Sequence, residues 1–214
     1  MVWAYALFSA FGQDCVDYAV DPKQLVNLED YATKGALEAG QKECLEKAYD
    51  EAELQTTKDK VSRVLLVNAY AYNTKDWAKL VKRHLDEVDR SDPDIAYLYA
   101  FYLYNNDKAD SDEVIDWTET ALERRDVWTG DVYVSRVYGL MRLRSMAGLS
   151  LWQLAEEKRI AGDKSKSPEQ LDQLRNRAKT FAREWVDFAK ASGRSSEQPM
   201  ELCLSVANEK ACGA

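Results

Sequence analysis

The stretch Val61–Pro93, VSRVLLVNAYAYNTKDWAKLVKRHLDEVDRSDP, decides the fold that the sequence predicts. Its mostly apolar positions recur three and four residues apart in two groups, and this spacing places each group on one face of a short helix. The first group is Val64, Leu65, Asn68, Ala69 and Tyr72, and the second is Trp77, Leu80, Val81, Leu85 and Val88. A polar turn joins the groups, and Asp92-Pro93 closes the second. The stretch therefore predicts a helix–turn–helix hairpin.

The same pattern returns further along the chain. Residues 69–73, AYAYN, are followed 32 residues later by residues 101–105, FYLYN. An amphipathic helix is expected after each, over 75–88 and over 112–124. A helix–turn–helix unit with a period of about 34 residues is the signature of tetratricopeptide arrays.

The chain therefore resembles the tetratricopeptide repeat (TPR) superfamily, with its clearest units at residues 61–93 and 94–126. Leu65 and Tyr97 stand where the family usually has Trp, and Phe101 stands where it has a small residue. The chain is thus similar to a degenerate, bacterial envelope-type member. The resemblance implies a stack of antiparallel helix pairs, an α-solenoid.

The resemblance also implies a partner-binding groove lined by the first helix of each unit. Carried over by position, the partner-facing residues are Arg63, Leu66, Tyr70, Asn73, Ile95, Leu98, Tyr102 and Asn105. Tyr70 is equivalent to Tyr102, and Asn73 to Asn105, which gives a ladder of aromatic and amide groups suited to a peptide or helical segment. The alternative is that these tyrosines only pack helix against helix.

The rest of the chain also reads as helical. Four prolines, nine glycines and no strand-like run predict an all-α protein of about seven to nine helices. Residues 95–104 are apolar all round, which indicates a helix buried between neighbours. A long helix is expected over about 132–161. Another should start at the capping sequence Ser167-Pro168-Glu169-Gln170, run to about Ala191 and stop at Gly193.

The domain prediction follows from these elements. Residues 1–194 are expected to form a single TPR-like helical domain. Residues 194–199, RSSEQP, read as a linker, and residues 195–214 as a tail with a short disulfide loop.

The formal charge of −8 argues against nucleic acid as a partner, because affinity for phosphate backbones depends on Lys and Arg. No apolar run reaches the roughly 18 residues that a membrane span needs. The predicted partner is therefore another protein, and a homo-oligomer stays open.

The four cysteines bear on the compartment. They are grouped as Cys15 with Cys44 and Cys203 with Cys212, which fits two disulfides in an exported protein. Reduced cysteines in a cytoplasmic protein are the alternative. The apolar segment 1–12 reads as a packed helix, a trimmed export signal or an interaction segment. We expect a periplasmic or otherwise extracytoplasmic location.

No catalytic or cofactor motif is found, so neither an enzyme nor a cofactor or metal site is predicted. The one histidine, His84, shares a predicted face with Val81 and Val88 and reads as a residue at the edge of the core. The basic side chains Arg175, Lys179 and Arg183 follow one another at four-residue intervals and read as a solvated helix face, with an acidic partner segment as the alternative.

Two functions are carried forward. The first is a non-enzymatic scaffold or adaptor that holds another protein of an envelope assembly. The second is a carrier of a small molecule or lipid, in which Trp128, Trp152 and Trp185 would enclose an apolar pocket between the helices.

Overall fold

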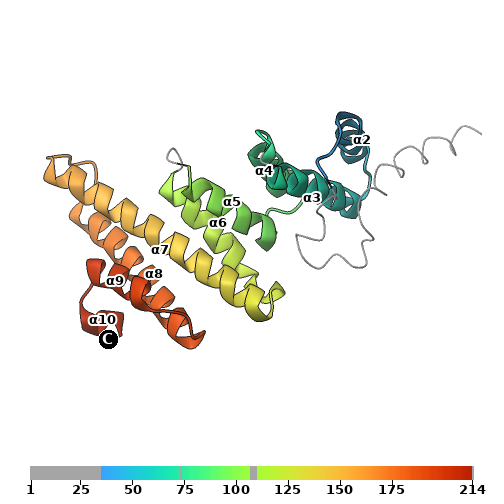
Figure 1. Ribbon diagram of the computed structural model, residues 1–214. Coiled ribbons are helices and arrows are strands. Elements are labelled where there is room, and N and C mark those ends of the chain that lie inside the picture. Colours follow the sequence, from blue (N-terminus) through green and yellow to red (C-terminus); the bar gives the residue numbers. More distant parts are fainter. Residues whose placement is uncertain (1–34, 73, 107–109, 214) are drawn as a thin grey trace, which may run out of the picture. The chain divides into compact units, whose positions relative to one another are not determined.

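The computed structural model describes residues 35–72, 74–106 and 110–213 (Figure 1). Within these ranges the chain forms nine α-helices, one short 3-10 turn and no strand, which confirms the predicted all-α fold. The helices are α2 (Ala39–Asp50), α3 (Gln55–Ala71), α4 (Trp77–Glu87), α5 (Pro93–Tyr104), α6 (Ser111–Glu123), α7 (Gly130–Ile160), α8 (Pro168–Ala191), α9 (Glu197–Val206) and α10 (Glu209–Cys212), with the turn η2 (Arg125–Val127) between α6 and α7.

The chain divides into two compact units, Met1–Arg90 and Ser91–Ala214. The sequence predicted a boundary near residue 194, whereas the boundary between these two units lies between Arg90 and Ser91. The C-terminal residues are no separate tail, because α9 and α10 pack on α8. Arg183 donates to the carbonyl of Ala211 at 2.8 Å, and Lys190 donates to that of Gly213 at 2.9 Å.

In the first unit, α3 packs against both α2 and α4. The core contains Leu45 of α2, Val61 and Leu65 of α3, and Val81 and Leu85 of α4, all almost fully buried. The apolar spacing in residues 61–88 thus marked the correct inner faces.

Tyr72 is the exception in that group. It was expected to face inward, but α3 ends at Ala71, and Tyr72 is the C-cap residue with 46% of its surface exposed. A residue beyond the last helical turn no longer follows the helical spacing, so the periodicity does not place its side chain.

A polar cluster ties α2 to α4 within the first unit. The Arg83 guanidinium lies 4.2 Å from the centre of the Tyr49 ring and donates to Glu46 at 2.6 Å. The Tyr49 hydroxyl donates to Glu87 at 3.0 Å. Burial, with this hydrogen bond as the second cause, raises the pKa of Tyr49 to about 12.

The second unit is built on α7, which lies between the α5–α6 pair and α8 (Figure 1). Leu143, Arg144 and Ser145 are consecutive and all buried. Neighbouring residues of a helix point about 100° apart, so α7 is covered on more than one side.

The ends of α8 follow the sequence signals. Ser167 and Gln170 form the predicted capping box. The helix ends at Ala191, and Gly193 adopts a φ of +68°, a left-handed conformation that favours glycine. Trp185, near the middle of the inner face, is fully buried.

A largely buried charge pair joins the first turn of α5 to α7. Arg136 donates to Asp94, and the indole nitrogen of Trp128 donates to the same carboxylate oxygen at 2.8 Å. The Arg136 guanidinium also lies 5.2 Å from the Trp128 ring and 5.4 Å from the Tyr97 ring. The Arg136 and Asp94 side chains are 12% and 16% exposed, so little water is available to solvate either charge if the other is removed.

We predict that Asp94→Asn lowers the free energy of unfolding by about 3 kcal/mol, because it removes the carboxylate charge that faces the largely buried Arg136 guanidinium. Urea denaturation followed by tryptophan fluorescence measures this. The control is Arg177→Gln, which removes the exposed ion pair with Asp112 and should cost about 0.5 kcal/mol or less. Equal losses in the two variants would contradict the importance of the buried pair.

The pKa of Tyr49 gives a pH prediction. In the folded chain the Tyr49 hydroxyl keeps a proton that it releases near pH 10 in the unfolded chain. The contribution of Tyr49 to the stability of the fold is therefore complete below pH 10 and is lost as pH rises toward 12. Absorbance at 295 nm should show a tyrosine component that ionises near pH 12. Tyr49→Phe should remove this component and Tyr70→Phe should leave it in place; a curve that is the same in wild type and Tyr49→Phe would refute the assignment.

Candidate functional site

The first repeat places its predicted partner-facing residues in different environments. Tyr70 has 55% of its surface exposed, near the end of α3, and its ring meets the Trp77 ring edge-on at 5.4 Å. Arg63 is partly buried and donates to Asp59 at 2.9 Å, within its own helix. Leu66 is fully buried. Asn73 lies outside the described residues.

The second repeat does not reproduce this pattern. Ile95 is fully buried, and Leu98 is partly buried. Tyr102 is also partly buried and stacks on Tyr99 at 6.1 Å. Asn105 is the exposed C-cap residue of α5, and its amide donates to Phe101 at 2.8 Å.

The prediction is therefore wrong for Leu66 and Ile95, which have no surface to offer a partner. The physical reason differs between the two. Leu66 lies on a helix that is covered by α2 and α4, and Ile95 lies in the first turn of a helix that is apolar all round and packs on α6 and α7. Of the two equivalent tyrosines, the one on α3 is the more exposed. Its ring contacts Trp77, and Tyr72 follows it two residues later as the exposed C-cap residue of α3; we call Tyr70, Tyr72 and Trp77 the α3–α4 aromatic patch.

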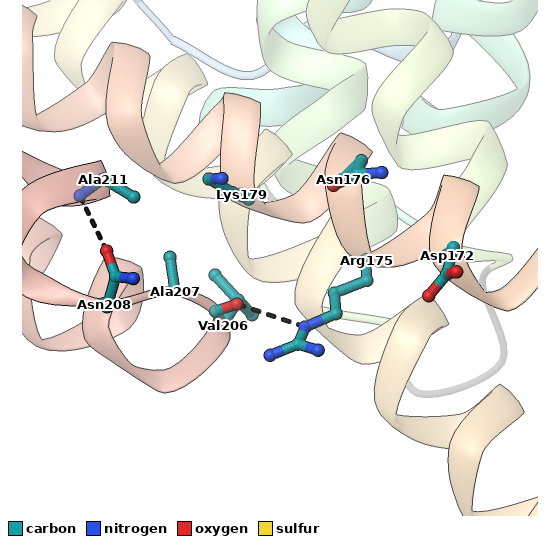
Figure 2. Close-up of a pocket in the computed structure, with 8 residues that line it drawn as sticks. All are labelled: Asp172, Arg175, Asn176, Lys179, Val206, Ala207, Asn208 and Ala211. Atoms are coloured by element: carbon teal, nitrogen blue, oxygen red, sulfur yellow. Dashed lines mark hydrogen bonds between the residues drawn. The ribbon is translucent and has the colours of Figure 1, made fainter.

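A cavity of about 560 Å³ lies between α8 and the C-terminal helices (Figure 2). One wall is a face of α8, formed by Asp172, Arg175, Asn176 and Lys179, and the other is formed by Val206, Ala207, Asn208 and Ala211. The α8 residues are spaced at i, i+3, i+4 and i+7, so they lie on one side of the helix.

Hydrogen bonds fix the second wall. The Nε of Arg175 donates to the carbonyl of Val206 at 3.3 Å, as Figure 2 shows. The Asn208 side chain caps α10 by accepting a hydrogen bond from the amide of Ala211 at 3.0 Å. The stripe predicted as a solvated face, Arg175, Lys179 and Arg183, thus meets the returning C-terminal segment. Nothing in the local sequence of α8 indicates that the chain returns to it.

The predicted disulfide between Cys203 and Cys212 is confirmed, with a sulfur–sulfur distance of 2.09 Å. It spans the second wall of the cavity, because residues 206–211 lie inside the ring that it closes. Cys44 is also disulfide-bonded. Its predicted partner, Cys15, lies outside the described residues.

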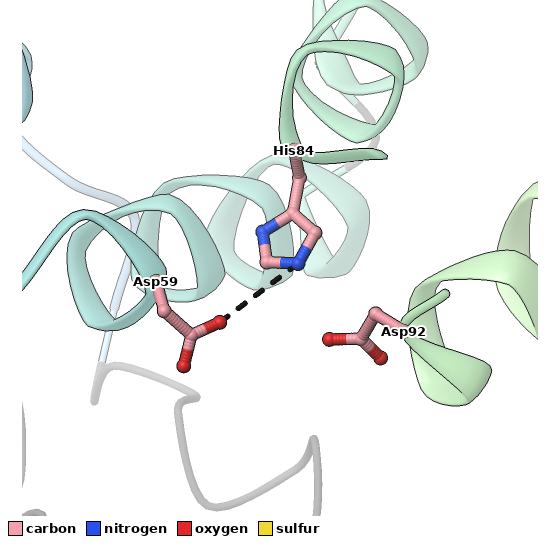
Figure 3. A group of neighbouring side chains, drawn as sticks. All are labelled: Asp59, His84 and Asp92. Carbon is pink, nitrogen blue, oxygen red and sulfur yellow. Dashed lines mark ion pairs between the residues drawn. The ribbon is translucent and has the colours of Figure 1, made fainter. Parts of the chain in front are cut away.

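His84 is fully buried in the first unit, deeper than the edge position predicted for it. Its Nδ1 lies 3.0 Å from the hydroxyl of Ser62, and its Nε2 lies 3.8 Å from a carboxylate oxygen of Asp59 (Figure 3). These are the residue types of a hydrolytic triad, but Ser62 is 1% exposed, so a substrate cannot reach its hydroxyl in this conformation. Asp92, also drawn in Figure 3, belongs to the second unit and caps α5.

The three tryptophans assigned to a carrier pocket make separate contacts. Trp128 is buried against Tyr97, Trp185 is buried against Tyr138, and Trp152 lies under the Arg175 guanidinium at 5.6 Å. The described contacts therefore use these rings in packing.

Comparisons of the chain with protein-family models, with curated proteins and with solved structures give no match. Among the described helices, none has the length and apolar character needed to cross a membrane.

Proposed function

We propose that this chain is a TPR-like scaffold that binds another protein through the α3–α4 aromatic patch. The observation that carries the proposal is the exposure of Tyr70 and Tyr72, at 55% and 46%, together with the edge-on contact of the Tyr70 ring with Trp77. Tyrosine and tryptophan are enriched at protein interfaces because each ring supplies a large contact area and a polar group that stays hydrated.

The helix pairing supports this proposal. Consecutive helices pack as pairs, α2 with α3, α3 with α4 and α5 with α6, as a degenerate helical repeat would require. The patch lies where the helix pair of the predicted 61–93 unit turns, and both of its tyrosines are exposed, whereas Trp77 is partly buried. A peptide or a helical segment of the partner is the ligand class that such a surface suits.

The proposed location is extracytoplasmic, with the periplasm as the first choice and a protein of the envelope as the partner. The disulfides support this, because they form and persist in oxidising compartments. We propose that the chain is not an enzyme. The burial of Ser62 and His84, the residues that come nearest to a catalytic pair, supports this view.

The carrier function is the alternative. The cavity beside α8 favours it only for a polar ligand, because five of its eight lining residues are polar or charged, two of these five are cations, and none of the other three is larger than valine. Native mass spectrometry of the purified chain tests this alternative directly, since a bound small molecule would appear as a fixed added mass.

The scaffold proposal predicts that the double variant Tyr70→Ala/Tyr72→Ala loses its partner. The wild type and this double variant are used as baits in a cross-linked pull-down from the envelope and soluble fractions of the parent organism. Truncation of interface aromatics costs about 2 kcal/mol, so recovery of the partner should fall at least tenfold relative to wild type. The variant should still fold, because surface changes alter stability by about 1 kcal/mol or less.

The matched control is Val127→Ala/Val132→Ala, which removes two side chains of similar exposure, 51% and 41%, from the second unit. It should recover the same partner as wild type. If the tyrosine variant also recovers that partner, the patch is not the binding surface. If no bait recovers a partner, the carrier function becomes the better explanation.

A further inference from the structure

We propose that the cavity between α8 and the C-terminal helices binds the carboxylate or phosphate group of a small molecule, and that the Cys203–Cys212 disulfide holds the site together. This inference concerns a different surface from the α3–α4 aromatic patch and does not depend on the scaffold proposal.

The cavity presents cationic donors that the fold does not use. Among the described residues, the Lys179 ammonium makes no ion pair or hydrogen bond, and neither does the Asn176 amide. Arg175 donates its Nε to the carbonyl of Val206, and its two terminal nitrogens make no hydrogen bond among the described residues. Three residues with groups able to donate therefore line one open volume.

The guanidinium is also held in place. The Trp152 ring lies 5.6 Å below it, and the hydrogen bond to Val206 fixes its direction. An arginine fixed in this way loses less conformational entropy when it binds, and its planar fork matches the two oxygens of a carboxylate or phosphate. Lys179, one helical turn further on, adds a point charge on the same side.

Asp172 narrows the ligand class. It lies one turn before Arg175 on the same face and is the one carboxylate among the lining residues. A carboxylate accepts hydrogen bonds only, so a suitable ligand carries a hydroxyl or amine donor near its anionic group. The volume of about 560 Å³ matches a small organic acid or a phosphate ester.

The disulfide decides whether the second wall exists. Helix α10 has four residues, and Cys212 is its one buried side chain. Such a short helix is not stable in isolation. The Cys203–Cys212 bond ties it to α9, and Arg183 and Lys190 of α8 hold its end through the carbonyls of Ala211 and Gly213. Reduction of the disulfide should therefore release α10 from its position in the second wall and weaken ligand binding.

Isothermal titration calorimetry of the full chain at fixed ionic strength tests the proposal, with inorganic phosphate and malate as the two probes. Each carries an anionic group and a hydroxyl. We expect one site per chain for at least one probe. Tighter binding of malate identifies a carboxylate ligand, and tighter binding of phosphate identifies a phosphate ligand. Failure of both probes to bind would overturn the proposal.

Two substitutions separate binding from folding. Lys179→Gln removes a charge that makes no hydrogen bond or ion pair among the described residues, so its effect reports on the ligand, and we expect affinity to fall about tenfold. Arg175→Gln should lower affinity at least as much. Lys166→Gln, in the exposed turn before α8, should leave it unchanged. Full affinity in Lys179→Gln and Arg175→Gln would place the anion elsewhere.

The role of the disulfide is tested with Cys203→Ser/Cys212→Ser, since a reducing agent would also act on Cys44. Affinity should fall at least tenfold, with the helix content measured by circular dichroism nearly unchanged. In the wild type, the backbone amide resonances of Ala207, Asn208 and Ala211 should shift during the titration. Wild-type affinity in the serine variant would refute the dependence on the disulfide.

Discussion

The second unit depends on the burial of one long helix from several sides. α7 has 31 residues, and its buried positions include three in succession, Leu143, Arg144 and Ser145. No single neighbour can cover such a helix, so α5, α6 and α8 must all pack against it. Burial of Arg144 in turn requires counter-charges, which Glu184 of α8 and Glu119 of α6 supply. The helix order around α7 is thus fixed by charge as well as by apolar area.

The elements that the sequence could predict are those whose ends carry local signals. Both ends of α8 were predicted closely, because Ser167 and Gln170 form a local capping box and Gly193 a local stop. The start of α9 was missed, because Pro199 was read as part of a linker. It lies in the first turn, where the backbone amides have no partner within the helix, so proline removes no hydrogen bond there.

The candidate site residues show a limit of a different kind. The spacing of the 61–93 stretch identified inner faces well, since those faces are set by the nearest two helices. It could not tell Tyr70 from Tyr102, because both follow the same local pattern. The difference comes from the neighbours: α5 is apolar on all sides and is covered by α6 and α7, so Tyr102 stacks on Tyr99, whereas Tyr70 meets Trp77 at an exposed turn.

The cavity beside α8 lay beyond local patterns altogether. Its cations were visible as a stripe at four-residue intervals, but a stripe on one helix indicates only a charged face. The second wall comes from residues 206–211, which are about 30 positions away from Arg175, and their return to α8 rests on backbone carbonyls that Arg175 and Arg183 bind. Any residue type can supply a carbonyl, so this contact leaves no mark in the sequence of α9 or α10.

Because the second wall of the cavity is held in this way, its presence depends on the Cys203–Cys212 disulfide. Little apolar surface is buried at α10, and the part-buried hydrogen bond from Arg183 and the exposed one from Lys190 each contribute about 1 kcal/mol. Closing the ring from Cys203 to Cys212 contributes about 2.5 kcal/mol by the loop-entropy argument. The covalent link is therefore the largest single contribution to keeping α10 in place. An oxidising compartment would preserve both the wall and the cavity, whereas a reducing one would leave α8 folded with its cationic stripe open to solvent.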